Sequence, residues 1–295
     1  MTRPPVDFII IGAMKCATST LHEQLAAQRG FFMSEPKELY FFSDDPVYAQ
    51  GIGWYRERFA AAGENDLRGE SSTHYTKLPT YPETVSRMRE HVPDAKLVYV
   101  IRHPIDRLVS QYIHEWTERT IDVTIDEAID VLPTLVAYSR YAMQLEPYLD
   151  VYGPERIRVI FFERLVSDPQ AVLSEVARFV GYDEPVRWFE GEASNRSSQR
   201  LRKSVVRDAI VWNPLVTGIR RRLIPKAWRN RVKSLWQMRE RPVLSERSVE
   251  RLTAVFDRDL AILSRWLGSE INCDNFRKVG RSVVPPLRYT ASQSR

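Results

Sequence analysis

Three apolar runs rich in β-branched residues recur along the chain, and each has the length of a strand that is buried on both faces. They cover residues 7–11, 96–101 and 156–162, and a weaker run over residues 67–72 leads into a polar loop. Short apolar runs bounded by turn residues are typical of strands in parallel sheets. We therefore expect strands at these four positions.

Between these runs, apolar residues recur at helical spacing, and Gly or Pro marks the ends of several segments. The pattern predicts a first helix from residue 18 to Gly30 and a connection without regular structure over residues 31–45. Strands that alternate with helices imply right-handed crossovers, and hence an α/β fold with a central parallel sheet flanked by helices. Further helices are expected over residues 52–60, 81–92, 104–118, 125–131, 140–151, 169–180 and 249–267.

The first strand runs directly into a loop that carries a lysine and a row of hydroxyl residues. Gly12 ends the strand, Lys15 lies in the loop, and residues 18–20 (Thr-Ser-Thr) open the next helix. A helix N-terminus offers unpaired N–H groups and a positive dipole to an anion, and the lysine adds a full charge. The stretch predicts a phosphate-binding loop, with a capped helix beside an exposed lysine as the alternative. It is not a Walker loop, because that pattern places its lysine later.

A second candidate anion site follows the second clear strand. Arg102 comes just after residues 96–101, Pro104 suits the first position of a helix, and Ser110 lies about two turns into that helix. Ligands of open α/β sheets bind at the carboxyl edge of the strands. The guanidinium of Arg102 suits a phosphate dianion, because it can donate two parallel hydrogen bonds. The alternative is that Arg102 only pairs with Asp106.

In this order, the two segments resemble motifs of the sulfotransferases that use 3′-phosphoadenosine 5′-phosphosulfate (PAPS). Residues 11–20 resemble the family's 5′-phosphosulfate loop, and residues 98–110 resemble its 3′-phosphate motif of an Arg and a Ser eight residues later. Residues 163–169, 195–202 and 242–268 also resemble segments of the Golgi-type and bacterial sulfotransferase domain. The resemblance implies a P-loop-like three-layer fold and the transfer of a sulfuryl group from PAPS to an acceptor hydroxyl. It implies nucleotide contacts from Lys15, Cys16, Ala17, Thr18, Ser19, Thr20, Arg102, Ser110, Arg200 and Arg202.

A further segment bears on catalysis. Residues 37–42 (Lys-Glu-Leu-Tyr-Phe-Phe) resemble the Glu-x-His-Phe-Phe segment of heparan sulfate sulfotransferases, in which the Glu is the catalytic base. The resemblance implies that Glu38 accepts the proton of the acceptor hydroxyl and that Lys15 stabilises the leaving oxygen. Glu38 as a surface partner of Lys37 is the alternative. His74 and His22 are alternative bases, although we expect His22 on a solvated helix face.

The chain departs from the family pattern at four positions. Tyr40 replaces the family's His, Ser43 replaces an Asp, and Ser71 stands where a Lys follows the Glu of the next motif. These three changes favour an acceptor that is not a heparin-like polyanion. Phe162 replaces the Tyr that cytosolic relatives place before Glu163.

The C-terminal part contains one more similar segment. Residues 276–280 (Phe-Arg-Lys-Val-Gly) resemble the Arg-Lys-Gly segment of cytosolic sulfotransferases. Because they follow the last strong helix, we expect an exposed tail there. We expect a single domain over residues 1–285 and a disordered tail over residues 286–295.

Positive charge is concentrated in one stretch of the chain. Residues 196–241 contain fourteen Lys and Arg against Asp208 and Glu240, a net of +12, whereas the whole chain carries only +5. Trp and Leu residues alternate with the arginines, which is a composition typical of a helix in a membrane interface. The alternative is a helical flap over the active site with solvated arginines. A membrane contact would favour a lipid-linked acceptor and a location at the cytoplasmic face of a membrane.

The remaining features narrow the class of protein. Two cysteines, Cys16 and Cys273, make no disulfide framework and fit a reducing cytoplasm. The chain has no run of about 18 apolar residues, so we expect no membrane span. No Cys/His cluster has metal spacing, so we expect no metal cofactor. We also expect no nucleic-acid partner. The competing functions are a P-loop kinase and a non-catalytic peripheral membrane protein. The acceptor stays open among carbohydrate, glycolipid and secondary-metabolite hydroxyls.

Overall fold

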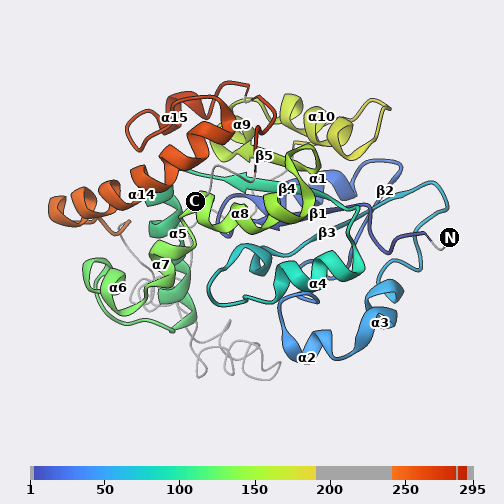
Figure 1. The fold of residues 1–295 in the computed structure, drawn as a ribbon, viewed down its shortest axis with the longest axis horizontal. Helices are drawn as coiled ribbons and strands as arrows, with labels where there is room; N and C mark the ends of the chain where they lie inside the picture. Colours follow the sequence, from blue (N-terminus) through green and yellow to red (C-terminus); the bar gives the residue numbers. More distant parts are fainter. Residues whose placement is uncertain (1–2, 191–240, 284, 291–295) are drawn as a thin grey trace, which may run out of the picture.

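Five parallel strands form one sheet in the described residues of the computed structural model, which are residues 3–190, 241–283 and 285–290. The strand order is β2-β3-β1-β4-β5, so the first strand of the chain lies in the middle of the sheet (Figure 1). This confirms the predicted α/β fold. The strands are β1 (Phe8–Gly12), β2 (Phe31–Met33), β3 (Leu67–Ser71), β4 (Lys96–Ile101) and β5 (Ile157–Phe161).

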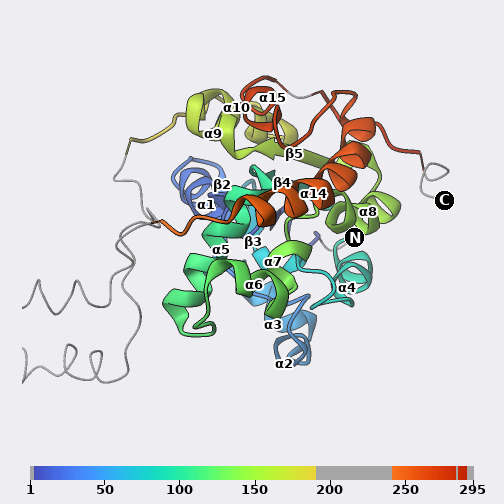
Figure 2. The ribbon, with the colours of Figure 1, turned by 90° about the vertical axis from the view of Figure 1, so that its left-hand side faces the viewer.

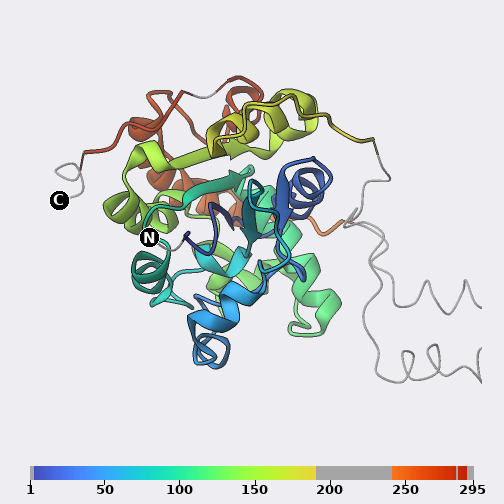
Figure 3. The ribbon, with the colours of Figure 1, turned by 90° about the vertical axis from the view of Figure 1, so that its right-hand side faces the viewer.

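Helices cover both faces of this sheet. α1 packs against α10 on one face, and α8 packs against α4 and α14 on the other (Figures 2 and 3). The helices are α1 (Thr18–Ala26), α2 (Asp45–Tyr48), α3 (Gly51–Glu57), α4 (Thr84–His91), α5 (Pro104–Glu118), α6 (Ile125–Val131), α7 (Thr134–Ala137), α8 (Tyr141–Tyr152), α9 (Phe162–Ser167), α10 (Pro169–Val180), α14 (Glu246–Leu267) and α15 (Phe276–Val279). Two 3₁₀ turns are η1 (Thr73–Thr76) and η2 (Pro154–Arg156).

The end of β1 is shaped by a change of register. β1 pairs with β4 from Phe8 to Ile10, and the register then shifts before Gly12 pairs with Tyr99. Gly12 has a φ of +151°, and a Cβ built on it would lie 1.9 Å from the hydroxyl oxygen of Thr76. Only glycine fits this close approach. The chain therefore leaves the sheet here and enters the loop that is predicted to bind phosphate.

A buried carboxylate joins the C-terminal helix to the domain. Asp259 of α14 accepts hydrogen bonds from the N–H groups of Ala142 and Met143 at 2.8 and 3.1 Å. These groups belong to the first turn of α8, where backbone donors have no partner within their own helix. The contact fixes α14 across α8. No helix in the described ranges combines the length and apolar character that a membrane span needs.

Several predictions about elements are corrected by the structure. Residues 31–33 form the edge strand β2 within the segment predicted to be irregular, and the first helix ends at Ala26 instead of reaching Gly30. Residues 276–279 form α15, in which Phe276 is fully buried, so this segment is not an exposed tail.

The predicted disordered tail is also wrong for residues 286–290. Leu287 is buried, the Arg288 N–H donates to the Trp266 carbonyl at 2.6 Å, and the Tyr289 hydroxyl donates to Asp150 at 2.5 Å. Residues 291–295 lie outside the described part of the chain. The predicted flap also lies outside it, except for Arg241, and so do Arg200 and Arg202.

Candidate active site

The loop after β1 turns sharply over the carboxyl edge of the sheet. The Ala13 N–H donates to the Val100 carbonyl at 2.7 Å, which holds the loop against β4. Lys15 and Ala17 both adopt left-handed backbone conformations, with φ of 71° and 63°. Ala17, the residue before α1, has no side chain that can accept a hydrogen bond. It therefore leaves the first N–H groups of α1 uncapped. The geometry is that of an anion-binding helix N-terminus.

The predicted loop residues differ in how they face this site. Thr18 is buried, and Ser19 and Thr20 are half-buried at the start of α1. Cys16 is fully buried, and this burial raises the pKa of its thiol to about 12. The thiol therefore stays protonated at neutral pH, and the Cys16 N–H donates to the Ala13 carbonyl at 3.2 Å within the loop.

Arg102 lies beside this loop, although it is 87 positions from Lys15 in sequence. Its Nη1 is 3.5 Å from the Lys15 carbonyl oxygen, and its guanidinium carbon lies 4.4 Å from the centre of the Phe162 ring. The hydroxyl of Tyr141 bonds to both the N–H and the carbonyl of Arg102, at 3.3 and 2.5 Å. The structure thus brings the two predicted anion-binding residues together and holds Arg102 from two sides.

The alternative partner of Arg102 is engaged elsewhere. Asp106 accepts hydrogen bonds from Arg277 at 2.8 Å and from Arg241 at 3.3 Å. The Asp106–Arg277 pair holds α15 against the start of α5. Phe276 of α15 also packs on Phe161 of β5, with 5.1 Å between ring centres. Ser110 is buried two turns into α5, as the sequence predicts, and its contact with a phosphate stays a prediction.

Glu38 is held at the carboxyl end of β3. Its N–H donates to the Ser71 carbonyl at 2.9 Å, and its carboxylate accepts hydrogen bonds from the N–H and the hydroxyl of Thr73, at 2.8 and 3.1 Å. Lys37 forms an ion pair with the other carboxylate oxygen. Glu38 is therefore more than a surface partner of Lys37, because three groups fix its position. Thr73 carries no motif of its own, and the polar loop after β3 is the only sequence signal for it.

Tyr40 connects Glu38 to a stack of rings. Its hydroxyl hydrogen-bonds to Glu38. The centre of its ring lies 3.9 Å from the centre of the His74 ring, and the His74 ring stacks on Tyr81 with 4.6 Å between ring centres. Burial, with a smaller effect of Lys77, lowers the pKa of His74 to about 4. His74 is therefore neutral at pH 7 and stays the alternative proton acceptor.

His22 does not lie on a solvated helix face, so that prediction is wrong. Only 8% of its surface is exposed, and its Nδ1 lies 2.9 Å from the hydroxyl oxygen of Ser71. Burial, followed by the charge of Lys37, lowers the pKa of His22 to about 4. The hydroxyl of Ser71, which replaces a family lysine, thus serves to bind a neutral imidazole from α1.

A buried carboxylate supports the loop that carries Glu38. Glu70 is fully buried and accepts hydrogen bonds from three hydroxyl groups, those of Tyr55, Ser72 and Tyr75, at 2.5, 2.6 and 2.7 Å. Burial raises the pKa of Glu70. Ser72 also accepts the N–H of Tyr40 at 3.2 Å, so the network holds the segment that carries Glu38. Within the described ranges, no three His, Cys, Asp or Glu residues gather as metal ligands.

Comparisons with known proteins show that this chain is similar to one family. A family model described as "Sulfotransferase family" matches residues 49–185, which include β3, β4, Arg102, Ser110 and β5. Mouse heparan sulfate glucosamine 3-O-sulfotransferase 5 is 28% identical over 185 residues, which cover 58% of this chain and 52% of the relative. Mouse heparan sulfate glucosamine 3-O-sulfotransferase 3A1 is 30% identical over 183 residues, which cover 59% of this chain and 45% of the relative. The chain thus spans about half the length of the curated relatives it matches.

A solved structure extends the likeness to nearly the whole chain. The sulfotransferase of Alicyclobacillus acidocaldarius superposes with a TM-score of 0.64 and 23% identity, and the match covers 92% of this chain and 98% of that one. The two proteins therefore share a fold. Residues 49–185 are thus similar to the sulfotransferase family, and nearly the whole chain shares the fold of a solved sulfotransferase.

Proposed function

We propose that this protein transfers the sulfuryl group of PAPS to an acceptor hydroxyl. The observation that carries the proposal is the contact between Arg102 and the backbone of Lys15, which joins two anion-binding elements at one sheet edge. PAPS bears a phosphosulfate at one end and a 3′-phosphate dianion near it. The α1 N-terminus with Lys15 suits the first group, and the guanidinium of Arg102 suits the second. A P-loop kinase would need a lysine at a different position of the loop.

The chemistry follows from the positions of Lys15 and Glu38. PAPS supplies a sulfuryl group that moves from a phosphate oxygen to the acceptor oxygen. One S–O bond breaks, a new S–O bond forms, and the negative charge that builds on the leaving oxygen is stabilised by the ammonium of Lys15. The proton of the acceptor hydroxyl passes to the carboxylate of Glu38, which Thr73 and Tyr40 hold in place.

The acceptor that we propose is a hydroxyl-bearing glycan. The names of the two mouse relatives give heparan sulfate as their acceptor. This chain differs from that family at Tyr40, Ser43 and Ser71, of which Tyr40 bonds to Glu38 and Ser71 bonds to His22. These differences lie beside the proposed base, so they bear on the acceptor and leave the nucleotide loop unchanged. Glycolipid and secondary-metabolite hydroxyls are the other candidates.

Nucleotide binding tests the proposal without knowledge of the acceptor. Calorimetric titrations should show that 3′-phosphoadenosine 5′-phosphate (PAP) binds more tightly than ADP with Mg²⁺. Arg102→Ala should weaken PAP binding by about 1.5–3 kcal/mol, the cost of losing a charged hydrogen-bonded pair. Arg89→Ala, which removes an exposed arginine on α4, is the matched control and should bind PAP normally. Equal affinity for the two nucleotides, or no effect of Arg102→Ala, would refute the proposal.

A further inference from the structure

Tyr141, the first residue of α8, joins the two anion-binding elements of the proposed nucleotide site. Its hydroxyl donates to the Arg102 carbonyl at 2.5 Å and accepts the Arg102 N–H at 3.3 Å. Its side chain also hydrogen-bonds to the thiol of Cys16, the residue after Lys15. One fully buried side chain therefore contacts both the loop after β1 and the turn after β4.

The two bonds to Arg102 fix the direction in which its side chain leaves the backbone. Both go to the same residue, one to its N–H and one to its carbonyl, so they hold the turn between β4 and α5 in one orientation. The next N–H, that of His103, donates to the Glu163 carboxylate at 2.9 Å, and Pro104 has none. The backbone donors of this turn are thus engaged within the protein, and a phosphate there depends on the guanidinium of Arg102.

The guanidinium of Arg102 is directed at the loop after β1. Its Nη1 lies 3.5 Å from the Lys15 carbonyl oxygen, and its carbon lies 4.4 Å from the centre of the Phe162 ring. Because a long side chain converts a small backbone rotation into a large displacement of its end, these contacts depend on the orientation that Tyr141 sets. Tyr141 is fully buried, so it acts on a bound phosphate only through Arg102.

The position of Tyr141 is itself fixed by two other elements. Asp259 of α14 accepts the N–H groups of the two residues that follow Tyr141, at 2.8 and 3.1 Å. The Tyr141 ring packs on Tyr99 and Phe276, with 6.1 and 6.5 Å between ring centres. Burial raises the pKa of Tyr141 well above its ordinary value, so the hydroxyl stays protonated and can donate to the Arg102 carbonyl.

Building on the proposed sulfuryl transfer, we propose that Tyr141 is a positioning residue for the 3′-phosphate of PAPS. Its hydroxyl holds Arg102 in the orientation that binds this phosphate, and it ties that orientation to the loop that carries Lys15. Removal of the hydroxyl therefore weakens the binding of nucleotides that have a 3′-phosphate and spares those that lack one.

Two nucleotides that differ only in the 3′-phosphate test this assignment: PAP and adenosine 5′-phosphate (AMP). Calorimetry measures their affinities for the full chain, as wild type and as Tyr141→Phe, which keeps the buried ring and removes only the hydroxyl. The preference for PAP over AMP should fall by about tenfold in the variant, and the affinity for AMP should change by less than about twofold. Urea denaturation checks that the variant is folded.

A double variant shows whether Tyr141 acts through Arg102. Arg102→Ala alone should remove most of the preference for PAP. Addition of Tyr141→Phe to Arg102→Ala should then change the PAP affinity no further, because the two substitutions disrupt the same contact.

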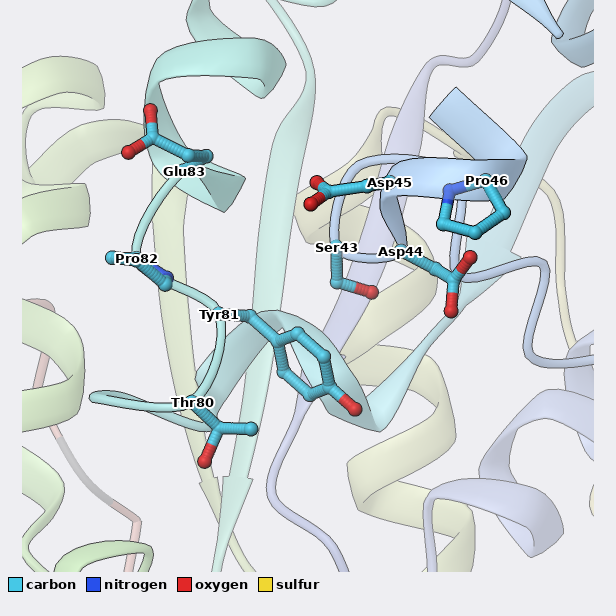
Figure 4. Close-up of a pocket in the computed structure, with 8 residues that line it drawn as sticks. All are labelled: Ser43, Asp44, Asp45, Pro46, Thr80, Tyr81, Pro82 and Glu83. Carbon is cyan, nitrogen blue, oxygen red and sulfur yellow. The ribbon is translucent and has the colours of Figure 1, made fainter. Parts of the chain in front are cut away.

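Two tyrosines outside the proposed nucleotide site serve as matched controls. Tyr152, at the other end of α8, is also buried, and its hydroxyl donates to the Val92 carbonyl at 3.2 Å. Tyr81 lines a pocket of about 350 Å³, and none of the eight residues drawn there belongs to the proposed nucleotide site (Figure 4). Tyr152→Phe and Tyr81→Phe should both keep the wild-type preference for PAP.

The outcomes separate this assignment from the proposed function. Equal losses of PAP and AMP affinity in Tyr141→Phe, an unchanged preference for PAP, or additive losses in the double variant would overturn the role of Tyr141 while sulfuryl transfer stands. If PAP does not bind to the wild-type chain, the proposed function fails, and the role of Tyr141 fails with it.

Discussion

At the scale of single residues, the position of Glu38 depends on one donor residue from another segment and one from its own segment. The Thr73 N–H and hydroxyl hold one carboxylate oxygen, and the Tyr40 hydroxyl adds a further bond. Together these donors fix the orientation of the carboxylate. The side chain is therefore preorganised to accept a proton from an acceptor at one defined place.

Replacement of Glu38 by Gln keeps its shape and removes its basicity. We expect kcat to fall by about 10²–10⁴, the usual contribution of a general base, while PAP affinity stays nearly unchanged because the nucleotide loop is intact. Steady-state kinetics and calorimetry measure the two quantities. Near-normal kcat in Glu38→Gln together with a collapse in His74→Ala would transfer the role to His74.

The buried histidine of α1 predicts a pH dependence of stability. The pKa of His22 is about 4 in the folded chain, against 6.5 for a solvated histidine, so the unfolded chain binds more protons between these values. The free energy of unfolding therefore decreases as the pH falls from about 6.5 to 4. At pH 5 the decrease that His22 causes is about 2 kcal/mol. His22→Gln keeps a polar group near Ser71 without titrating.

Urea denaturation of the wild-type chain and of His22→Gln, each at pH 7 and pH 5, measures the contribution of His22 to the free energy of unfolding. The wild-type chain should lose about 2 kcal/mol more than His22→Gln between the two pH values. The same loss in both proteins would show that His22 is not buried in its neutral form.

Sequence motifs indicated Lys15, Arg102 and Glu38 as candidates because each lies next to the end of a strand or within a recognisable segment. They did not find the burial of His22 or the network around Glu70. The burial of His22 depends on which face of α1 meets β3, and the Glu70 network depends on how Tyr55 and Tyr75 pack. The spacing of residues along the sequence predicts neither. Tertiary packing set these positions.

At the scale of elements, β3 shows how tightly the sheet is packed. A Cβ on Gly69 would lie 2.3 Å from the Phe8 ring and 2.5 Å from the Met33 sulfur, both buried. Gly69→Ala should therefore cost about 1–3 kcal/mol of unfolding free energy, as overpacked cores do. Gly53→Ala is the matched control, because nothing lies within 4 Å of its Cβ in α3; it should be neutral or stabilising by up to about 1 kcal/mol.

Chemical denaturation of the two glycine variants gives the comparison. If Gly69→Ala were as stable as Gly53→Ala, the close approach of β1, β2 and β3 at this position would be wrong.

The long elements were predictable because their patterns are long. α5 and α6 begin and end where the apolar periodicity and Pro104 predict, whereas β2 has only three residues and no periodicity to detect. α15 was missed for a different reason, since it is short and owes its position to Phe276 packing on Phe161 and His103.

At the scale of the whole molecule, the sequence predicts the layers but not the order of the strands. The alternation of strands and helices predicts a parallel sheet, and the order β2-β3-β1-β4-β5 follows only once each crossover is placed in space. That order brings together the ends of β1, β2, β3 and β4, and with them the loops that carry Lys15 after β1, Glu38 after β2 and Arg102 after β4.

The basic stretch over residues 196–241 supports a separate prediction from composition alone. We propose contact with an anionic membrane at its cytoplasmic face. The protein should co-sediment with anionic vesicles at low salt, release as salt approaches physiological ionic strength, and lose binding when Arg220, Arg221 and Arg222 become Glu. Lack of binding at low salt would leave a soluble acceptor.

The central claim is that this chain moves a sulfuryl group from PAPS, with Lys15 stabilising the leaving oxygen. The most direct measurement is the transfer of ³⁵S label from PAPS to acceptors in an extract of the producing cells, by the wild-type chain and by Lys15→Ala. We expect labelled product from the wild type and a loss of about 10²–10³ in rate for the variant, while PAP still binds to both. Absence of labelled product from a wild-type protein that binds PAP, or equal transfer by Lys15→Ala, would contradict the account.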